Sequence, residues 1–124
     1  MTNKEIVEEF TQVVFNERHL ELIDKYMHDD YVQHNPTVAQ GKAGFLDFAE
    51  NRFFKYNPNL HIEIKHIYED GDVVVSHNLA VCEPGVNENI VFDVYRLRDG
   101  KLAEHWDCIQ HLTDEQLKDT DALF

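Results

Sequence analysis

The spacing of apolar residues changes from helical to alternating at Pro58, and this change restricts the fold more than any other feature. Before Pro58, apolar side chains recur at the spacing of amphipathic helices, and after it they alternate or form short runs, as strands do. Helices are predicted after a Thr2–Glu5 capping box, near residues 20–27 and 42–56, and as a last turn at Thr113–Gln116. Strands are predicted over residues 60–65, 73–81, 90–97 and 102–109.

Two Asp-Gly pairs, Asp70-Gly71 and Asp99-Gly100, lie between successive predicted strands and indicate tight hairpins. Helices followed by an antiparallel meander predict an α+β fold, with the helices packed on a curved antiparallel sheet and a pocket between the layers. The polar stretch 29–36 is predicted to be an irregular break, because Pro36 moves Asn35 away from helical geometry.

Size and charge limit the classes of partner. With 124 residues and a net charge of -13, the chain is predicted to form one domain, 1–124, that does not bind nucleic acid or anionic membranes. No apolar run approaches the roughly 20 residues that a membrane helix needs, and no signal peptide is apparent. Cys82 and Cys108 are too few for a disulfide scaffold, so we expect a cytoplasmic protein.

The first hairpin is predicted to place His77 on the pocket face. If Asp70-Gly71 is a two-residue turn, Ile64 lies opposite His77 and the apolar face contains two histidines. A slip of one residue would instead place His77 beside Glu63. His77 is then either a substrate-contacting group or a histidine satisfied within the core.

The second hairpin admits two registers. A three-residue loop with Gly100 as the bulge residue places Asp93 and Asp107 on the same face of the sheet. A two-residue turn places them on opposite faces. We favour the bulged loop, because it collects the polar residues on one side. That face contains Val91, Asp93, His105, Asp107 and Ile109, and the opposite face contains Phe92, Val94, Leu102 and Trp106.

Asp107 is the most informative single residue. A carboxylate on an apolar strand costs several kcal/mol unless it is paired or protonated. Burial favours the neutral form of a carboxyl group and can make it a proton acceptor near neutral pH. Asp107 is therefore a candidate general base, and the alternative is a structural aspartate bonded to backbone or to Arg96.

The remaining histidines suggest weaker hypotheses. His34 is predicted at the rim of the pocket or, alternatively, as a loop cap. His34, His77, His105 and Asp93 could in principle hold a metal, but no helical His-x-x-x-His spacing supports this, so no metal and no cofactor are predicted. Cys108 alternates away from Asp107 and lacks an activating base.

Four segments, in this order, carry a family resemblance: Tyr31-Val-Gln-His-Asn-Pro36, Gly41-x-x-Gly-Phe45, Asp93-Val-Tyr-Arg96 and Gly100-Lys-Leu-Ala-Glu-His-Trp-Asp107. Together they resemble the SnoaL-like polyketide cyclase family, within the nuclear transport factor 2-like superfamily. The resemblance implies a cone of helices on a curved sheet, often in a homodimer, with a deep apolar cavity. It also implies cofactor-free aldol chemistry, with Asp107 matching the carboxylate that moves a proton next to a carbonyl.

The sequence departs from that family on the penultimate strand. The cyclases offer Gln and His there, and the matching positions hold Val91 and Asp93. This departure weakens the case for a polyketide and suggests a coupled cluster of His77, Asp93 and Asp107 instead. The first helix carries no Tyr, so ketosteroid isomerase chemistry is not expected.

The leading hypothesis is a cofactor-independent lyase or isomerase acting on a small, mainly apolar carbonyl compound. Asp107 is the predicted base, His77 and His34 hold the enolate oxygen, and Asp93 orients a histidine. The alternative is a ligand-binding or dimerising module without chemistry. The predicted substrate-contacting residues are Tyr31, Phe48, Phe53, Val91, His105 and Trp106.

Overall fold

The computed structural model describes residues 1–124, with helical segments first and the long strands after them. The helical segments are α1 (Asn3–Phe10), the π-helical turn η1 (Thr11–Asn16), the 3-10 turn η2 (Leu20–Lys25), α2 (Gly41–Phe48), the π-helical turn η3 (Ala49–Phe53), α3 (Phe54–Tyr56) and the 3-10 turns η4 (Gln116–Lys118) and η5 (Thr120–Leu123). The strands are β1 (Met27–Gln33), β2 (His61–Asp70), β3 (Val73–Glu83), β4 (Asn87–Arg98) and β5 (Lys101–His111).

The predicted helices are confirmed in position, except that the second ends at Lys25 and Met27 begins β1 instead. α1 begins at the predicted cap. The backbone N–H of Glu5 donates to Thr2 Oγ1 at 3.1 Å, and the N–H of Thr2 donates to Glu5 Oε1 at 3.0 Å. This reciprocal pair satisfies two N–H groups that an uncapped helix leaves free. α2, η3 and α3 follow one another directly, as the predicted third helix requires. No helix is long and apolar enough to span a membrane.

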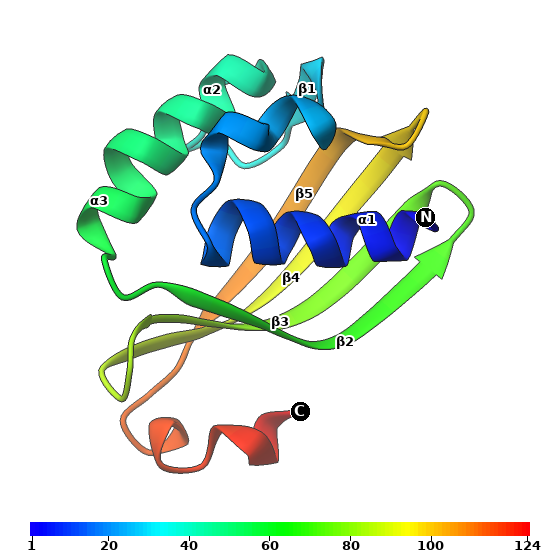
Figure 1. Cartoon of the computed structure of the whole chain (residues 1–124). Coiled ribbons are helices and arrows are strands. Elements are labelled where there is room, and N and C mark those ends of the chain that lie inside the picture. Colours follow the sequence, from blue (N-terminus) through cyan, green and yellow to red (C-terminus); the bar gives the residue numbers. More distant parts are fainter.

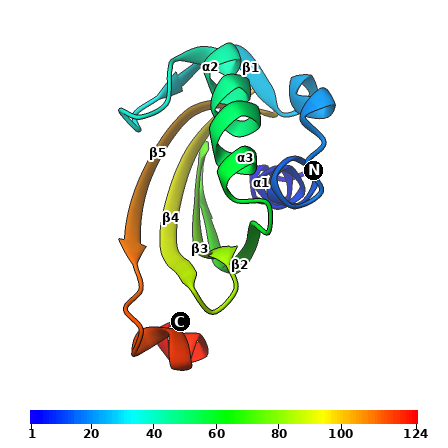
Figure 2. The same cartoon turned by 90° about the vertical axis from the view of Figure 1, so that its left-hand side faces the viewer.

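The five strands form one sheet in the order β1-β5-β4-β3-β2, and the sheet curves strongly around the helices (Figures 1 and 2). The predicted α+β class is therefore confirmed. The predicted break at residues 29–36 is wrong in its first half, because β1 pairs with β5 there. This pair is parallel, so the sheet is not antiparallel throughout.

Helices α1 and α2 lie on the concave side of the sheet (Figures 1 and 2). Apolar residues of both layers meet between them in one core cluster. Burial of this apolar surface is the main stabilising contribution to such a two-layer fold. The cluster comprises Ile6, Val7, Phe10, Val14, Ile23, Tyr26, Met27, Tyr31, Phe45, Ala49, Val74, Tyr95, Leu97 and Leu102.

The first hairpin corrects the prediction for His77. Its turn is Gly71-Asp72, with Asp70 opposite Val73, and a bulge interrupts β2 between Ile64 and His66. Because one extra residue exchanges the two faces of a strand, Ile64 and His66 no longer share a face. Val74, Ser76, Asn78 and Ala80 are therefore buried on the concave side of β3, and His77 points to the convex side.

The second hairpin places Asp93 and Asp107 on one face, as predicted, but the predicted three-residue loop is wrong. Asp99 and Gly100 form a two-residue turn with φ values of 53° and 76°, as a type I′ turn requires. The bulge lies instead between Leu102 and Glu104, and it returns Asp93 to a position directly opposite Asp107. Leu102 precedes this bulge and is fully buried in the core, so its predicted outward position is wrong.

The C-terminal turns lie beyond β5, against the convex side of the β2–β3 hairpin. The predicted turn at Thr113–Gln116 forms, with the Gln116 N–H bonded to Thr113 Oγ1. The carbonyl oxygen of Phe124 lies 2.9 Å from His66 Nε2, and the Phe124 ring lies 4.8 Å from the His77 ring. This segment therefore covers part of the convex face.

Candidate active site

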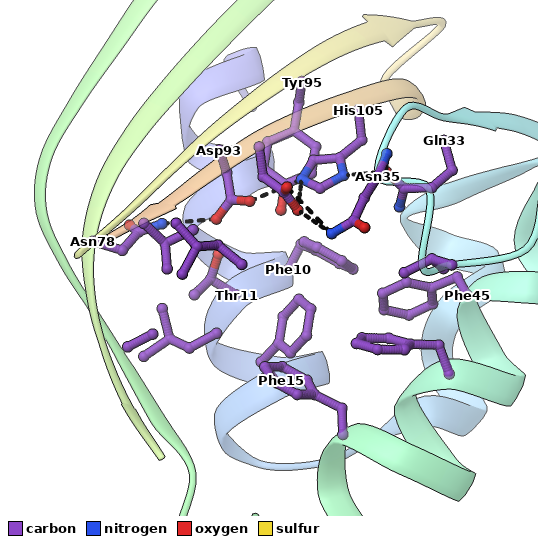
Figure 3. A pocket seen from close by; sticks show the side chains of 18 of the residues that line it. Phe10, Thr11, Phe15, Gln33, Asn35, Phe45, Asn78, Asp93, Tyr95 and His105 are labelled. Atoms are coloured by element: carbon purple, nitrogen blue, oxygen red, sulfur yellow. Dashed lines mark hydrogen bonds and ion pairs between the residues drawn. The ribbon is translucent and has the colours of Figure 1, made fainter. Parts of the chain in front are cut away.

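A cavity of about 120 Å³ lies between the helices and the concave face of the sheet. Most of its walls are apolar or aromatic, and most of its polar groups come from β3, β4, β5 and the end of β1 with the loop after it (Figure 3). Seven of the residues predicted from the sequence line it: Tyr31, Phe48, Phe53, Val91, Asp93, His105 and Asp107.

Three predicted site residues do not line the cavity. His77 stacks on Phe92 at 4.2 Å on the convex face. The His34 and Trp106 rings stack on each other at 4.6 Å, and His34 Nε2 lies 2.7 Å from Glu104 Oε2. The expected contacts of His77, His34 and Trp106 with a substrate in the cavity are therefore wrong. Alternation along the strands, with the bulges described above, explains their outward positions.

His105 lies between a carboxylate and an amide. Its Nε2 is 2.8 Å from Asp93 Oδ1, and its Nδ1 is 2.8 Å from Gln33 Oε1 (Figure 3). The second oxygen of Asp93 accepts a hydrogen bond of 2.9 Å from Asn78 Nδ2. The histidine that Asp93 contacts is thus His105 of the neighbouring strand, and not the predicted His77.

Hydrogen-bond accounting locates one proton of His105. The backbone N–H of Asn35 donates to Gln33 Oε1 at 3.0 Å, so this amide atom is an oxygen. An oxygen facing His105 Nδ1 requires that Nδ1 carry a proton. Another proton then lies between Nε2 and Asp93 Oδ1, either on the ring or on the carboxyl group. Both arrangements give the pair His105–Asp93 no net charge.

Asp107 has a different environment from Asp93. Both of its carboxylate oxygens face Asn35 Nδ2, at 3.2 and 3.1 Å. The orientation of this amide is set by Thr37, whose N–H and hydroxyl donate to Asn35 Oδ1 at 3.0 and 2.7 Å. The nearest charged partner, His105 Nε2, is 3.9 Å from Asp107 Oδ2. Asp107 therefore accepts from a neutral donor and has free lone pairs in the cavity.

The loop that carries Asn35 is anchored to α2. The side chain of Gln40 accepts from the Gln33 N–H at 2.9 Å and donates to the Gln33 carbonyl at 2.6 Å. Gly44 packs so closely that a Cβ there would lie 2.1 Å from the Ala39 carbonyl oxygen. These contacts hold Asn35 over Asp107.

Two tyrosines enclose the His105 ring. The Tyr95 ring stacks on it at 4.8 Å and the Tyr31 ring at 6.3 Å. Burial, and then the Asp93 carboxylate, raise the pKa of Tyr31 and the pKa of Tyr95 well above the ordinary value for a phenol. Both groups line the cavity and stay protonated, so they can donate hydrogen bonds but cannot act as bases near neutral pH.

Four polar residues that surround the Asp93, His105 and Asp107 cluster were not predicted as site residues: Gln33, Asn35, Asn78 and Tyr95. Gln33 and Asn35 alternate with Val32 and His34, which is a strand pattern and was a signal for both. Tyr95 lies two residues after Asp93 on β4, so alternation also placed it on the site face. Asn78 gave no such signal, because β3 is apolar on nearly every position.

A divalent cation could be held by the same cluster. One ligand atom each from Asp93, His105 and Asp107 lies within 4.8 Å of the others, and one imidazole with two carboxylates is a usual donor set. The set considered from the sequence, His34, His77, His105 and Asp93, does not converge, because His34 and His77 lie outside the cavity.

Solved structures share this fold. IdmH from Streptomyces antibioticus is 20% identical, with a TM-score of 0.76 over 89% of this chain and 93% of that chain. A SnoaL-like polyketide cyclase from Agrobacterium tumefaciens is 14% identical, with a TM-score of 0.76 over 89% and 92%. A cystatin-fold protein from Novosphingobium aromaticivorans is 23% identical, with a TM-score of 0.74 over 87% and 98%.

The sequence comparison extends over most of the chain. No protein with a curated function matches it. Residues 5–116 match the SnoaL-like polyketide cyclases, which agrees with the four segments that carry the resemblance. The chain therefore belongs to the SnoaL-like polyketide cyclase family.

Proposed function

We propose that this protein catalyses cofactor-independent proton transfer next to a carbonyl group, as an isomerase or an aldol-type lyase, on a small, mainly apolar compound. The observation that carries this proposal is the environment of Asp107. Its carboxylate lies in an apolar cavity, accepts only from the Asn35 amide, and has no cation bonded to it. Such a carboxylate is poorly solvated and is available to accept a proton.

In the proposed reaction, Asp107 removes a proton from the carbon next to the substrate carbonyl. The electron pair of the C–H bond moves to form the enolate, and Asp107 becomes a neutral carboxylic acid. In an isomerisation, Asp107 returns this proton to another carbon. In an aldol condensation, the enolate carbon attacks a second carbonyl, and the resulting alkoxide takes the proton from Asp107.

The neighbouring residues support the charge that develops on the enolate oxygen. The hydroxyls of Tyr31 and Tyr95 stay protonated and can donate to this oxygen. His105 contributes its charge from 3.9 Å when the shared proton lies on its ring, and Asp93 orients that ring. These residues take the role that the sequence suggested for His77 and His34.

The test is exchange of α-protons for deuterium in small neutral ketones, with acetophenone and phenylacetone as probes, followed by proton NMR. Replacing Asp107→Asn keeps the shape and removes the base, so exchange should fall by about 100- to 10,000-fold. Cys108→Ser is the matched control, because Cys108 is exposed on the same strand and does not line the cavity. Exchange at the wild-type rate in the Asp107→Asn protein would exclude Asp107 as the base.

The alternative function is ligand binding without chemistry. It predicts that the wild-type protein binds these ketones without exchanging their protons. It also predicts that Asp107→Asn changes affinity alone.

A further inference from the structure

We infer that the substrate is compact and uncharged, and that the cavity rejects anionic compounds, including carboxylated and phosphorylated ones. This inference rests on the proposed function, because it identifies the class of carbonyl compound that Asp107 acts on. Three observations carry it: the charge of the polar cluster, the composition of the cavity wall and the size of the cavity.

The polar cluster carries one net negative charge. Asp93 and His105 share a proton and together are neutral, whichever of them holds it. Asp107 adds one negative charge when it is ionised, as its role as base requires. A carboxylate or phosphate in the cavity would therefore meet a charge of the same sign in surroundings of low dielectric constant, where repulsion is strong.

No group in the wall offsets this charge. The cavity is lined by 19 residues, and none of them is a lysine or an arginine. The guanidinium of Arg52 lies 5.2 Å from the centre of the Phe48 ring, but it donates to the Thr37 carbonyl and is exposed, so water screens it. An anion would lose its hydration on entry without gaining an ion pair.

A cation is a poor substrate for the opposite reason. It would pair with Asp107, surrounded by aromatic faces such as those of Phe45 and Phe48, and this would be a favourable contact. However, the pairing would occupy the carboxylate that removes the proton. Small cations of this shape are therefore expected to inhibit, and an uncharged substrate leaves Asp107 free.

The size of the cavity limits the substrate to about one ring. A single water needs roughly 10–15 Å³ on the same scale, so a cavity of about 120 Å³ holds on the order of ten non-hydrogen atoms. Phe10, Phe15 and Phe45 limit its depth, and their rings pack within 6 Å of one another. Fused multi-ring compounds exceed this space.

The experiment compares planar compounds of one shape and three charges: acetophenone, benzoate and benzamidinium. Their dissociation constants are measured by NMR titration of the ¹⁵N-labelled full chain, so no turnover is needed. We expect acetophenone to bind at least about tenfold more tightly than benzoate. Benzamidinium should compete with acetophenone, and this competition should weaken in Asp107→Asn. The fused-ring ketone anthrone should bind much more weakly than acetophenone.

Asp107→Asn tests the charge directly, because it removes the one net negative charge of the polar cluster and retains the shape. The preference for acetophenone over benzoate should shrink in this variant, and Asp114→Asn, at an exposed position outside the cavity, should leave it unchanged. The comparison of the three compounds on the wild-type protein keeps the test available if Asp107→Asn does not fold.

Two results would overturn the inference. Benzoate binding as tightly as acetophenone would show that the cavity does not reject anions, and anthrone binding as tightly would show that the size limit is wrong. Neither result concerns catalysis. Conversely, persistent α-proton exchange in Asp107→Asn would exclude Asp107 as the base, but it would not change the measured preference for uncharged compounds.

Discussion

The two faces of the β4–β5 hairpin carry similar residues with different consequences. On the convex face, His34 stacks on Trp106 and pairs with Glu104, and both members of that pair are partly exposed. On the concave face, His105 stacks on Tyr95 and pairs with Asp93, and their side chains are only 8% and 16% exposed. Water competes for the first pair and is nearly excluded from the second. Enclosure therefore distinguishes the His105–Asp93 pair from the His34–Glu104 pair.

The sharpest test of this comparison is removal of the histidine on each face. His105→Ala leaves Asp93 buried without its partner, so the free energy of unfolding should fall by about 3 kcal/mol. His34→Ala, on the convex face, should cost about 1 kcal/mol or less, because it loses a partly exposed pair with Glu104 and a stack on Trp106. Urea denaturation of both variants measures the difference. Equal losses would show that enclosure does not distinguish the two faces.

Loss of the Gln33 acceptor should have the next largest effect. Gln33→Leu leaves the Nδ1–H of His105 and the N–H of Asn35 without their acceptor, at a cost of about 1–3 kcal/mol. The control is Gln110→Leu, at an exposed position on the same sheet, which should have little effect on stability. The same denaturation experiment applies. An unaffected Gln33→Leu protein would contradict the assigned proton on Nδ1.

The convex stack should contribute to stability and not to catalysis. A double-mutant cycle of His34→Ala and Trp106→Ala should give a coupling energy of about 0.5–1.5 kcal/mol. Exchange of α-protons should continue at nearly the wild-type rate in Trp106→Ala. A loss of exchange comparable to that of Asp107→Asn would place Trp106 in the catalytic site after all.

The smallest expected effect concerns the pH dependence of stability. Burial, and then the nearby His66, lower the pKa of His77 below its ordinary value. The unfolded chain therefore binds more protons at this position than the folded chain, so this contribution to stability is lost as pH falls below about 6.5. His77→Phe keeps a ring against Phe92, and it should reduce that loss by on the order of a few tenths of a kcal/mol, since His77 is partly exposed. Urea denaturation between about pH 7.5 and about pH 5 measures it. If stability fell more at low pH in His77→Phe than in the wild type, the pKa of His77 would not be lowered in the folded protein.

Much of the architecture and part of the site follow from local pattern. The change of period at Pro58 predicted helices before strands, because helices and pleated strands place side chains at different intervals. On β4 and β5, Asp93, His105 and Asp107 alternate with Phe92 and Trp106, so one face was recognisable as polar within an apolar strand.

Tertiary structure decided the features that depend on distant partners. β1 is a strand because β5, more than sixty residues later, pairs with it, and a polar stretch alone does not predict such a partner. The bulge after Ile64 decided which face holds His77, and β3 is apolar on both faces, so its pattern could not determine the side. One extra residue exchanges the faces of a strand with almost no change in composition, and for this reason only the assembled sheet determined which histidine reaches the cavity.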